Sequence, residues 1–107
     1  MTDSSPLSNA APSAAAWAVY LLECNDGRVY TGIARDPLAR YAKHVAGKGA
    51  RFTRSNPPRQ LLGWLWVAGH SEALRLEYAW KQLPREQRIA ALKANSYHTP
   101  AVSQDAS

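Results

Sequence analysis

The sequence predicts a single α+β domain, a three-stranded antiparallel sheet flanked by helices in the order β-β-α-β-α-α. Three observations lead to this fold class. Two short apolar segments flank the turn signal Asn25-Asp26-Gly27, which predicts a β-hairpin. Helical start signals and helical periodicity follow at 36–46, 72–83 and 85–93. A third apolar segment, 61–68, separates the first of these helices from the other two.

The predicted hairpin joins two segments rich in aliphatic and aromatic side chains, 17–23 and 28–33. A three-residue loop would place Tyr20 opposite Gly32 and would bring Tyr20 and Tyr30 to the same face of the sheet. A two-residue loop would place the two tyrosines on opposite faces. The sequence leaves both registers open.

The first helix is predicted to begin at Asp36-Pro37, because Asp is a good N-cap and Pro a good first helical residue. It is expected to run to about residue 46 and to end at the glycine that follows. Its apolar stripe, expected to face the core, consists of Leu38, Ala42 and Val45. Arg40 and His44, four residues apart, would then share a face well away from that stripe.

Residues 47–60, GKGARFTRSNPPRQ, are predicted to form a long basic loop. Several cations surround one aromatic ring, a composition that suits phosphate contact and base stacking. The residues expected to contact nucleic acid here are Lys48, Arg51, Phe52 and Arg54, with Lys43 from the preceding helix. The alternative is a plain surface loop with Phe52 in the core.

The apolar segment 61–68 is predicted to be a third strand, central in the sheet or covered on both faces, because its residues are apolar on both sides. Ser71 is expected to cap the next helix, 72–83. Four of its residues are predicted to point inward, namely Ala73, Leu76, Trp80 and Leu83. Glu77 lies at the border of that apolar stripe. Pro84 separates this helix from the last one, 85–93.

The two ends of the chain, 1–16 and 94–107, are mostly small and polar, so disordered tails are predicted around a domain at 17–93. The formal net charge of +5 favours a polyanionic partner, although many small proteins are simply basic. No apolar run is long enough to span a membrane, and no signal-peptide pattern is found. One cysteine, Cys24, fits a reducing compartment. We therefore expect a cytoplasmic protein, and a monomer.

The order of elements and the residues on them resemble the GIY-YIG nuclease domain, and more narrowly the small stand-alone bacterial proteins of that superfamily. The matching features are Ala18-Val19-Tyr20, Tyr30-Thr31-Gly32, Arg40 ten residues after Tyr30, His44 one helical turn later, the basic segment 47–54, and Glu77. The first motif lacks its glycine and has Val for Ile, and the second has Thr for Ile. Asn56 and Asn95 do not match the late asparagine of many family enzymes.

The resemblance implies a metal-dependent endonuclease that hydrolyses phosphodiester bonds in DNA. It implies that Glu77 binds Mg²⁺ or Mn²⁺ and that Arg40 donates to the phosphate. Tyr20 would act as the base or orient the attacking water. To act as a base, the Tyr20 phenol requires nearby cations or the metal to lower its pKa. Tyr30 would orient water or phosphate, and His44 would take or relay the proton.

Two other functions fit the same sequence. A non-catalytic nucleic-acid-binding module would need the basic segment but not Glu77. A protein-interaction domain would need neither Arg40 nor the basic segment. Without the resemblance, Tyr20 and Tyr30 are ordinary packing residues at the edge of the core, and Glu77 is a solvated acid or a salt-bridge partner.

Overall fold

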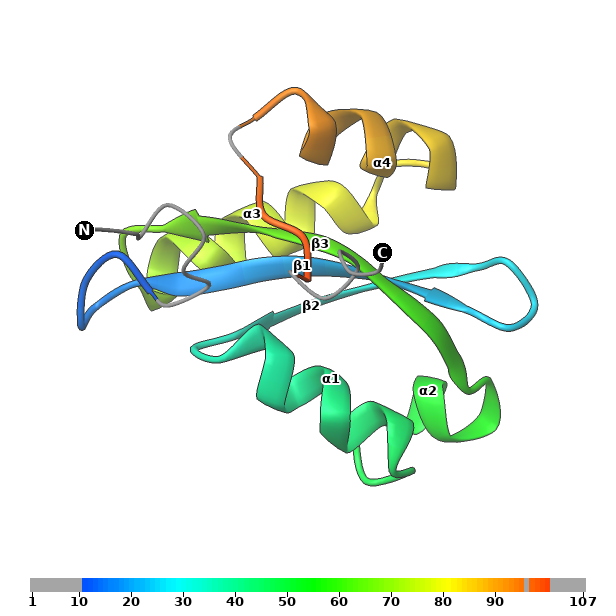
Figure 1. Ribbon diagram of the computed structural model, residues 1–107. Helices are drawn as coiled ribbons and strands as arrows, with labels where there is room; N and C mark the ends of the chain where they lie inside the picture. Colours follow the sequence, from blue (N-terminus) through cyan, green and yellow to red (C-terminus); the bar gives the residue numbers. More distant parts are fainter. Residues whose placement is uncertain (1–10, 96, 101–107) are drawn as a thin grey trace, which may run out of the picture.

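The computed structural model describes residues 11–95 and 97–100 of the 107-residue chain (Figure 1). The described residues form three strands and four helices. In chain order these are β1 (Trp17–Cys24), β2 (Val29–Ala34), α1 (Pro37–Val45), α2 (Arg51–Ser55), β3 (Pro58–Val67), α3 (His70–Lys81) and α4 (Arg85–Lys93). The α+β class and the antiparallel sheet predicted from the sequence are confirmed. The short helix α2 is the one element that the sequence did not predict.

The three strands form one antiparallel sheet in the order β2-β1-β3. Of the two alternatives for 61–68, the central position is wrong, because β1 occupies the centre and β3 an edge. Cover on both faces holds, since Trp64 lies in the cluster on one face and Leu65 packs against the cluster on the other. Trp64 of β3 exchanges two backbone hydrogen bonds with His98, at 2.9 and 2.8 Å. This short pairing covers part of the outer edge of β3, which satisfies backbone groups that an edge strand would otherwise leave free.

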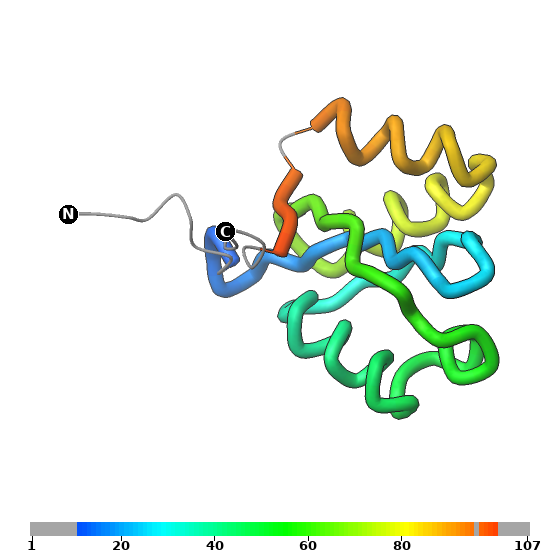
Figure 2. The backbone as a smooth tube through the Cα atoms, turned by 45° about the vertical axis from the view of Figure 1, so that its right-hand side comes forward, coloured from blue at the N-terminus to red at the C-terminus, as the bar shows by residue number. Residues whose placement is uncertain are grey.

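Helices cover both faces of the sheet, as Figures 1 and 2 show from two directions. Helices α1 and α2 lie on one face, which carries a cluster that contains Tyr20, Leu22 and Trp64. Helices α3 and α4 lie on the other face, where Trp80 and Leu92 pack against Leu21. Burial of these side chains on both sides of β1 explains why that strand is apolar at every position except Glu23.

The hairpin has the three-residue loop. Tyr20 pairs with Gly32 and Leu22 with Tyr30, so the two tyrosines lie on the same face of the sheet. Gly27 has a φ of 89°, which a glycine adopts without strain. The backbone N–H of Cys24 donates to the carbonyl of Arg28 at 2.9 Å and closes the turn. The register that brings the tyrosines together is therefore the one that forms.

Helix α1 begins where the sequence predicted, since the Asp36 side chain accepts a hydrogen bond from the Ala39 N–H at 3.1 Å. The predicted inward face is wrong. Leu38 is 37% exposed and Val45 is 58% exposed, whereas His44 is buried. The side chain of Tyr41 packs against the cluster on the sheet, on the same side of the helix as His44. The helix thus presents its aromatic side to the sheet and its aliphatic side to solvent.

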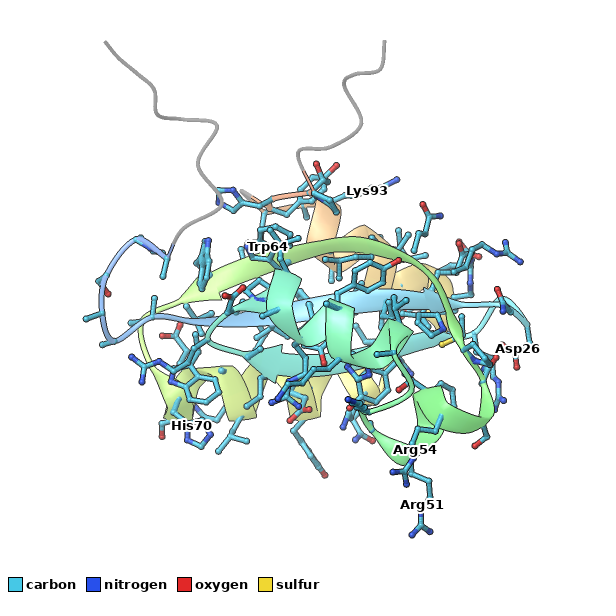
Figure 3. The ribbon with its side chains drawn as sticks, turned by 60° about the horizontal axis from the view of Figure 1, so that its bottom comes forward. Asp26, Arg51, Arg54, Trp64, His70 and Lys93 are labelled. Carbon is cyan, nitrogen blue, oxygen red and sulfur yellow. The ribbon has the colours of Figure 1, made fainter. Side chains whose placement is uncertain are left out.

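The predicted basic loop is wrong in part, because residues 51–55 form α2 and β3 begins at Pro58. Gly47, with a φ of 77°, ends α1 and turns the chain toward α2. Proline can begin β3 because an edge strand has donors that need no partner in the sheet. Figure 3 shows α2 at the same end of the molecule as Asp26, and the Asn56 side chain donates to Asp26 at 2.8 Å.

The last two helices follow the sequence closely, with one correction. Ser71 does not cap α3, which begins at His70 with Gly69 as its N-cap residue. Instead, the carboxylate of Glu72 accepts a hydrogen bond from the Ala68 N–H at 3.2 Å. The four residues predicted to face inward all lie in the cluster under α3, namely Ala73, Leu76, Trp80 and Leu83.

Parts of both predicted tails, 1–10, 96 and 101–107, lie outside the described residues. Of the rest, Ala16 is buried and the Arg35 guanidinium donates to the Ala14 carbonyl at 2.5 Å. The domain limits of 17–93 stay a prediction. Within the described residues, no helix is both long and apolar enough to cross a membrane.

Candidate active site

A chain of buried hydrogen bonds links β1, α1 and α2. The hydroxyl of Tyr20 lies 2.8 Å from Nε2 of His44, and Nδ1 of the same ring lies 2.7 Å from the hydroxyl of Thr53. The Thr53 hydroxyl also lies 2.9 Å from the backbone carbonyl of Ala50. Each of the three side-chain residues is only 1% exposed. We call Tyr20, His44 and Thr53 the buried relay.

The direction of every hydrogen bond in the buried relay follows from its last member. The Ala50 carbonyl can only accept, so the Thr53 hydroxyl proton points toward it. The Thr53 oxygen must then accept from the imidazole, which places the proton of neutral His44 on Nδ1. Nε2 is left as an acceptor and receives the Tyr20 hydroxyl proton. One threonine thus fixes the tautomer that can accept a proton from the tyrosine.

Two glycines make room for these side chains. A Cβ atom on Gly32 would overlap the Tyr20 ring, coming within 2.5 Å of its Cζ and closer still to its hydroxyl. A Cβ atom on Gly49 would overlap the His44 ring in the same way. Glycine is therefore required at both positions by close approach. Of the glycines that the two tripeptide motifs of the family contain, this sequence keeps only Gly32.

The electrostatics keep both ring groups of the relay neutral at pH 7. Burial raises the pKa of Tyr20 far above its ordinary value, and the neighbouring Tyr30 and Glu77 add to this while Arg40 opposes it. Burial also lowers the pKa of His44, and the positive charge of Arg40 lowers it further. Arg40 does lower the pKa of Tyr20, but burial outweighs this effect. A neutral phenol donates to a neutral imidazole.

Tyr30 lies beside the relay and is only half-buried. Its ring meets the His44 ring edge-on at a centroid distance of 5.4 Å, and it stacks on Phe52 at 5.8 Å. Burial raises the pKa of Tyr30, whereas the charges of Lys81 and Arg40 lower it and Glu77 raises it. These influences show that charged groups from α1 and α3 meet around Tyr30.

Glu77 is the acidic member of that group. Its carboxylate lies 3.2 Å from Nζ of Lys81, one helical turn further along α3, and its side chain is 19% exposed. It raises the pKa of both tyrosines, although α3 covers the opposite face of the sheet. In the part of the chain that the structure describes, no three His, Cys, Asp or Glu residues cluster as a metal site.

Tyr20, Tyr30 and His44 lie together, and the charges of Arg40 and Glu77 influence both tyrosines. The role of these five residues in a common site stays a prediction. The predicted nucleic-acid contacts are more dispersed. Figure 3 shows Arg51 and Arg54 projecting away from the body of the domain at α2, and Lys43 and Lys48 are exposed. Phe52 is partly buried and packs on Tyr30, and its contact with nucleic acid stays a prediction.

Sequence reasoning missed Thr53, which completes the relay. The segment that carries it was interpreted as a loop, and a loop threonine has no predictable partner. The available signal was its spacing, since Thr53 follows Gly49 by four residues and both contact the same histidine. The two asparagines considered earlier lie elsewhere, with Asn56 bonded to Asp26 and Asn95 to the Ala91 carbonyl.

The fold is that of a nuclease-type domain with one tyrosine on each of two neighbouring strands. The side chains that match this class are those of Tyr20, Tyr30, Arg40, His44 and Glu77. The family model of the GIY-YIG catalytic domain matches residues 16–90, and the chain belongs to this family. The match covers all three strands, α1, α2 and α3, and most of α4. It confirms the resemblance that the sequence motifs indicated and places the chain in a nuclease superfamily whose substrates are nucleic acids.

The chain is similar to several bacterial proteins that carry the name UPF0213. It is 49% identical over 74 residues to one from Cupriavidus pinatubonensis, covering 69% of this chain and 82% of the relative. It is 44% identical over 78 residues to one from Xanthomonas axonopodis pv. citri, covering 73% and 76%. The solution NMR structure of a UPF0213 protein from Bacillus halodurans is 38% identical, covers 75% of this chain and 85% of that one, and superposes with a TM-score of 0.46.

We expect Thr53→Val to remove the preference of His44 for the tautomer that carries its proton on Nδ1. Valine has nearly the same shape but offers no acceptor, so the Nδ1–H is left buried and unpaired, at a cost of about 1–3 kcal/mol in unfolding free energy. Imidazole ¹⁵N NMR of the wild type should show Nδ1 protonated and Nε2 bare. The valine variant should lose this pattern, and Thr53→Ser, which keeps the hydroxyl, should retain it. A wild-type pattern in Thr53→Val would contradict the proposed direction of the relay.

Proposed function

We propose that this protein is a divalent-metal-dependent endonuclease that hydrolyses phosphodiester bonds in DNA. The observation that carries the proposal is the buried relay beside Tyr30, Arg40 and Glu77. A binding module has no use for a buried, tautomer-fixed imidazole that accepts from a phenol. A hydrolase needs such a group, because the attacking water must lose a proton.

The cations around Tyr30 and on α2 bind the substrate. Arg40 donates to the scissile phosphate through a planar fork, which suits phosphate oxygens and stabilises the charge that develops on them. Lys81 adds a second positive charge near Tyr30. The half-buried Tyr30 hydroxyl is positioned to orient the phosphate or the water. The exposed cations of α2 and its preceding loop contact phosphates further along the strand.

Glu77 fits a metal ion as a single oxygen ligand. Mg²⁺ keeps several waters and is commonly held by one or two carboxylates together with substrate phosphate oxygens, so one partly exposed carboxylate suffices. Lys81 at 3.2 Å must share the carboxylate or turn away when the ion binds. When bound, Mg²⁺ or Mn²⁺ would neutralise charge on the phosphate and lower the pKa of water.

The relay supplies the proton acceptor. The Tyr20 oxygen takes the proton of the attacking water while the Tyr20 proton passes to Nε2 of His44. His44 becomes a cation whose Nδ1–H stays bonded to Thr53. Tyr20 is neutral before and after this transfer, so its raised pKa is no obstacle. The reaction therefore needs neutral His44, and its rate should fall as the pH drops through the lowered pKa of that residue.

A non-catalytic nucleic-acid-binding module on the same scaffold is the second candidate. The observation that favours it is the ion pair between Glu77 and Lys81, which satisfies the carboxylate without a metal. Incubation of the protein with labelled single- and double-stranded DNA, with Mg²⁺, with Mn²⁺ or with EDTA, separates the two candidates. Cleavage that requires a divalent ion supports the endonuclease. Binding without cleavage under all three conditions supports the module.

The cations at α2 lead to a prediction about binding. We expect the triple variant Lys48→Ala, Arg51→Ala, Arg54→Ala to bind DNA more weakly and with a flatter dependence on salt, because fewer counterions are released. If all three contact phosphates, the slope of log K against log salt should fall by about three. These side chains are exposed, so the melting temperature should stay close to that of the wild type. Unchanged affinity would exclude this surface from the interface.

A further inference from the structure

A pocket of about 580 Å³ lies at the tip of the hairpin, apart from the buried relay. Three segments distant in sequence form its walls, namely residues 26–29 of the hairpin, Phe52 of α2, and Arg85 and Arg88 of α4. Figure 1 shows the hairpin tip with α4 on one side of the sheet and α2 on the other. The volume is in the range of small-ligand sites.

Arg88 is held in this pocket as a rigid cation. Its Nε donates to the Leu83 carbonyl at 3.0 Å, and its Nη1 donates to the Val29 carbonyl at 2.9 Å and the Thr31 hydroxyl at 3.0 Å. These acceptors are neutral, so they orient the guanidinium without cancelling its charge. No carboxylate of the described residues lies within ion-pair distance of it. A cation already fixed in place binds an anion at little entropic cost.

The other two arginines of the pocket carry compensated charges. Arg28 pairs with Asp26 at 2.6 Å, and Arg85 pairs with Glu23 at 2.9 Å. Their role in the pocket is therefore to shape its walls. The Arg28 guanidinium lies over the Phe52 ring, 4.8 Å from its centre, in a cation–π contact that holds it at the wall of the pocket.

The pocket adjoins the candidate active site. Phe52 forms part of its wall and also stacks on Tyr30 at 5.8 Å with an interplanar angle of 20°. Arg28 immediately precedes β2 and is two residues from Tyr30, a separation of about 7 Å in an extended chain. A nucleic-acid strand carries a phosphate at short, regular intervals. A strand whose scissile phosphate lies at Tyr30 can therefore place a neighbouring nucleotide in the pocket.

We propose that this pocket binds a second nucleotide of the substrate strand, next to the one that is cleaved; this rests on the proposed function. Arg88 holds the phosphate of that nucleotide, and the Arg28 guanidinium, supported by the Phe52 ring, stacks on its base. The contact fixes the position of the strand relative to Tyr30, so it determines which phosphodiester bond reaches the relay.

The test measures fluorescence anisotropy of a fluorescein-labelled DNA oligonucleotide, as single strand and as duplex, in EDTA and across a range of salt. We expect Arg88→Gln to weaken binding about tenfold, the loss of a charge-assisted hydrogen bond. It should also lower the salt slope by about one, as for a single phosphate contact. The matched control is Lys93→Ala, which removes an exposed positive charge from the end of the same helix and should change affinity less than about twofold.

Arg88 also braces β2, so melting temperatures are measured for every variant and Arg28→Ala serves as an independent test. Arg28 is exposed and pairs with an exposed acid, so this variant should fold normally and bind about fivefold more weakly. If the wild type cleaves DNA while Arg28→Ala and folded Arg88→Gln bind as the control does, the subsite is wrong and the proposed function stands. If the wild type neither binds nor cleaves DNA, the proposed function fails and the subsite fails with it.

Discussion

Glu77→Gln abolishes DNA cleavage but leaves DNA binding intact: this is the result we expect if Glu77 holds the metal. Glutamine keeps the size of the side chain and one oxygen acceptor, but it removes the charge that attracts a divalent cation. Without the cation, the charge on the phosphate is not neutralised, and a loss of several kcal/mol of transition-state stabilisation corresponds to a rate decrease of about a thousandfold or more. Binding in EDTA should persist or tighten, because one negative charge near the phosphate is gone.

The paired measurement is strand cleavage with Mg²⁺ and affinity in EDTA, for the wild type and the variant. Glu72→Gln is the matched control, since it makes the same substitution on α3 and glutamine can still accept from the Ala68 N–H. It should cleave at the wild-type rate. A Glu77→Gln protein that cleaves as fast as an active wild type would show that the metal is held elsewhere or is not used.

Lys81 adds a detail to this expectation. In the absence of metal it pairs with Glu77 at 3.2 Å, and it lies close enough to Tyr30 to lower the pKa of that phenol. Removing the carboxylate frees the Lys81 ammonium for the phosphate. The gain in affinity of Glu77→Gln should therefore shrink as salt rises, because the interaction is between partly exposed charges.

The parts of the fold that the sequence predicted are those with strong local signals. The turn at residues 25–27 and its two apolar flanks predicted the hairpin, and Pro84 correctly separated α3 from α4. The register of the hairpin could not be settled from the sequence, because both loop lengths satisfy the same turn residues. The structure settles it through the Tyr20–Gly32 pair.

The error on the inward face of α1 has a physical cause, namely a preference for aliphatic burial over polar burial. On α1, the aliphatic side that includes Leu38 and Val45 gave a stronger hydrophobic signal than the side with His44, yet the structure buries His44. A histidine can be buried at little cost when both ring nitrogens have partners, and Tyr20 and Thr53 provide them. Those partners come from two other elements, so no local pattern could reveal them.

The same reasoning explains what could be predicted of the candidate site. Five of its residues were predicted from their match to the spaced motifs of the family, and that match requires no knowledge of contacts. Thr53 was missed because its role exists only once α2 folds against α1. The pocket at the hairpin tip was missed for the same reason, since Arg88 meets Val29 only through the packing of α4 on the sheet.

The second large effect concerns the phenol of the relay. We expect Tyr20→Phe to remain folded and to lose most of its cleavage activity. The ring keeps its packing, and the cost in unfolding free energy is about 1–3 kcal/mol, because Nε2 of His44 loses its donor in a buried site. Cleavage should fall by about a hundredfold to ten-thousandfold, the usual contribution of a positioned proton acceptor.

Tyr41→Phe is the matched control, because Tyr41 packs against the same cluster on the sheet from α1 and should tolerate loss of its hydroxyl with activity unchanged. The pH dependence gives a further readout that packing alone would not move. In the wild type, the rate should decrease as the pH falls through the pKa of His44, which burial and Arg40 place below 6.5. Residual cleavage by Tyr20→Phe should lack this acidic limb, because water can no longer pass its proton to Nε2 through the phenol. A well-folded Tyr20→Phe protein with full activity and an unchanged pH profile would show that Tyr20 is a packing residue and that the relay has no part in catalysis.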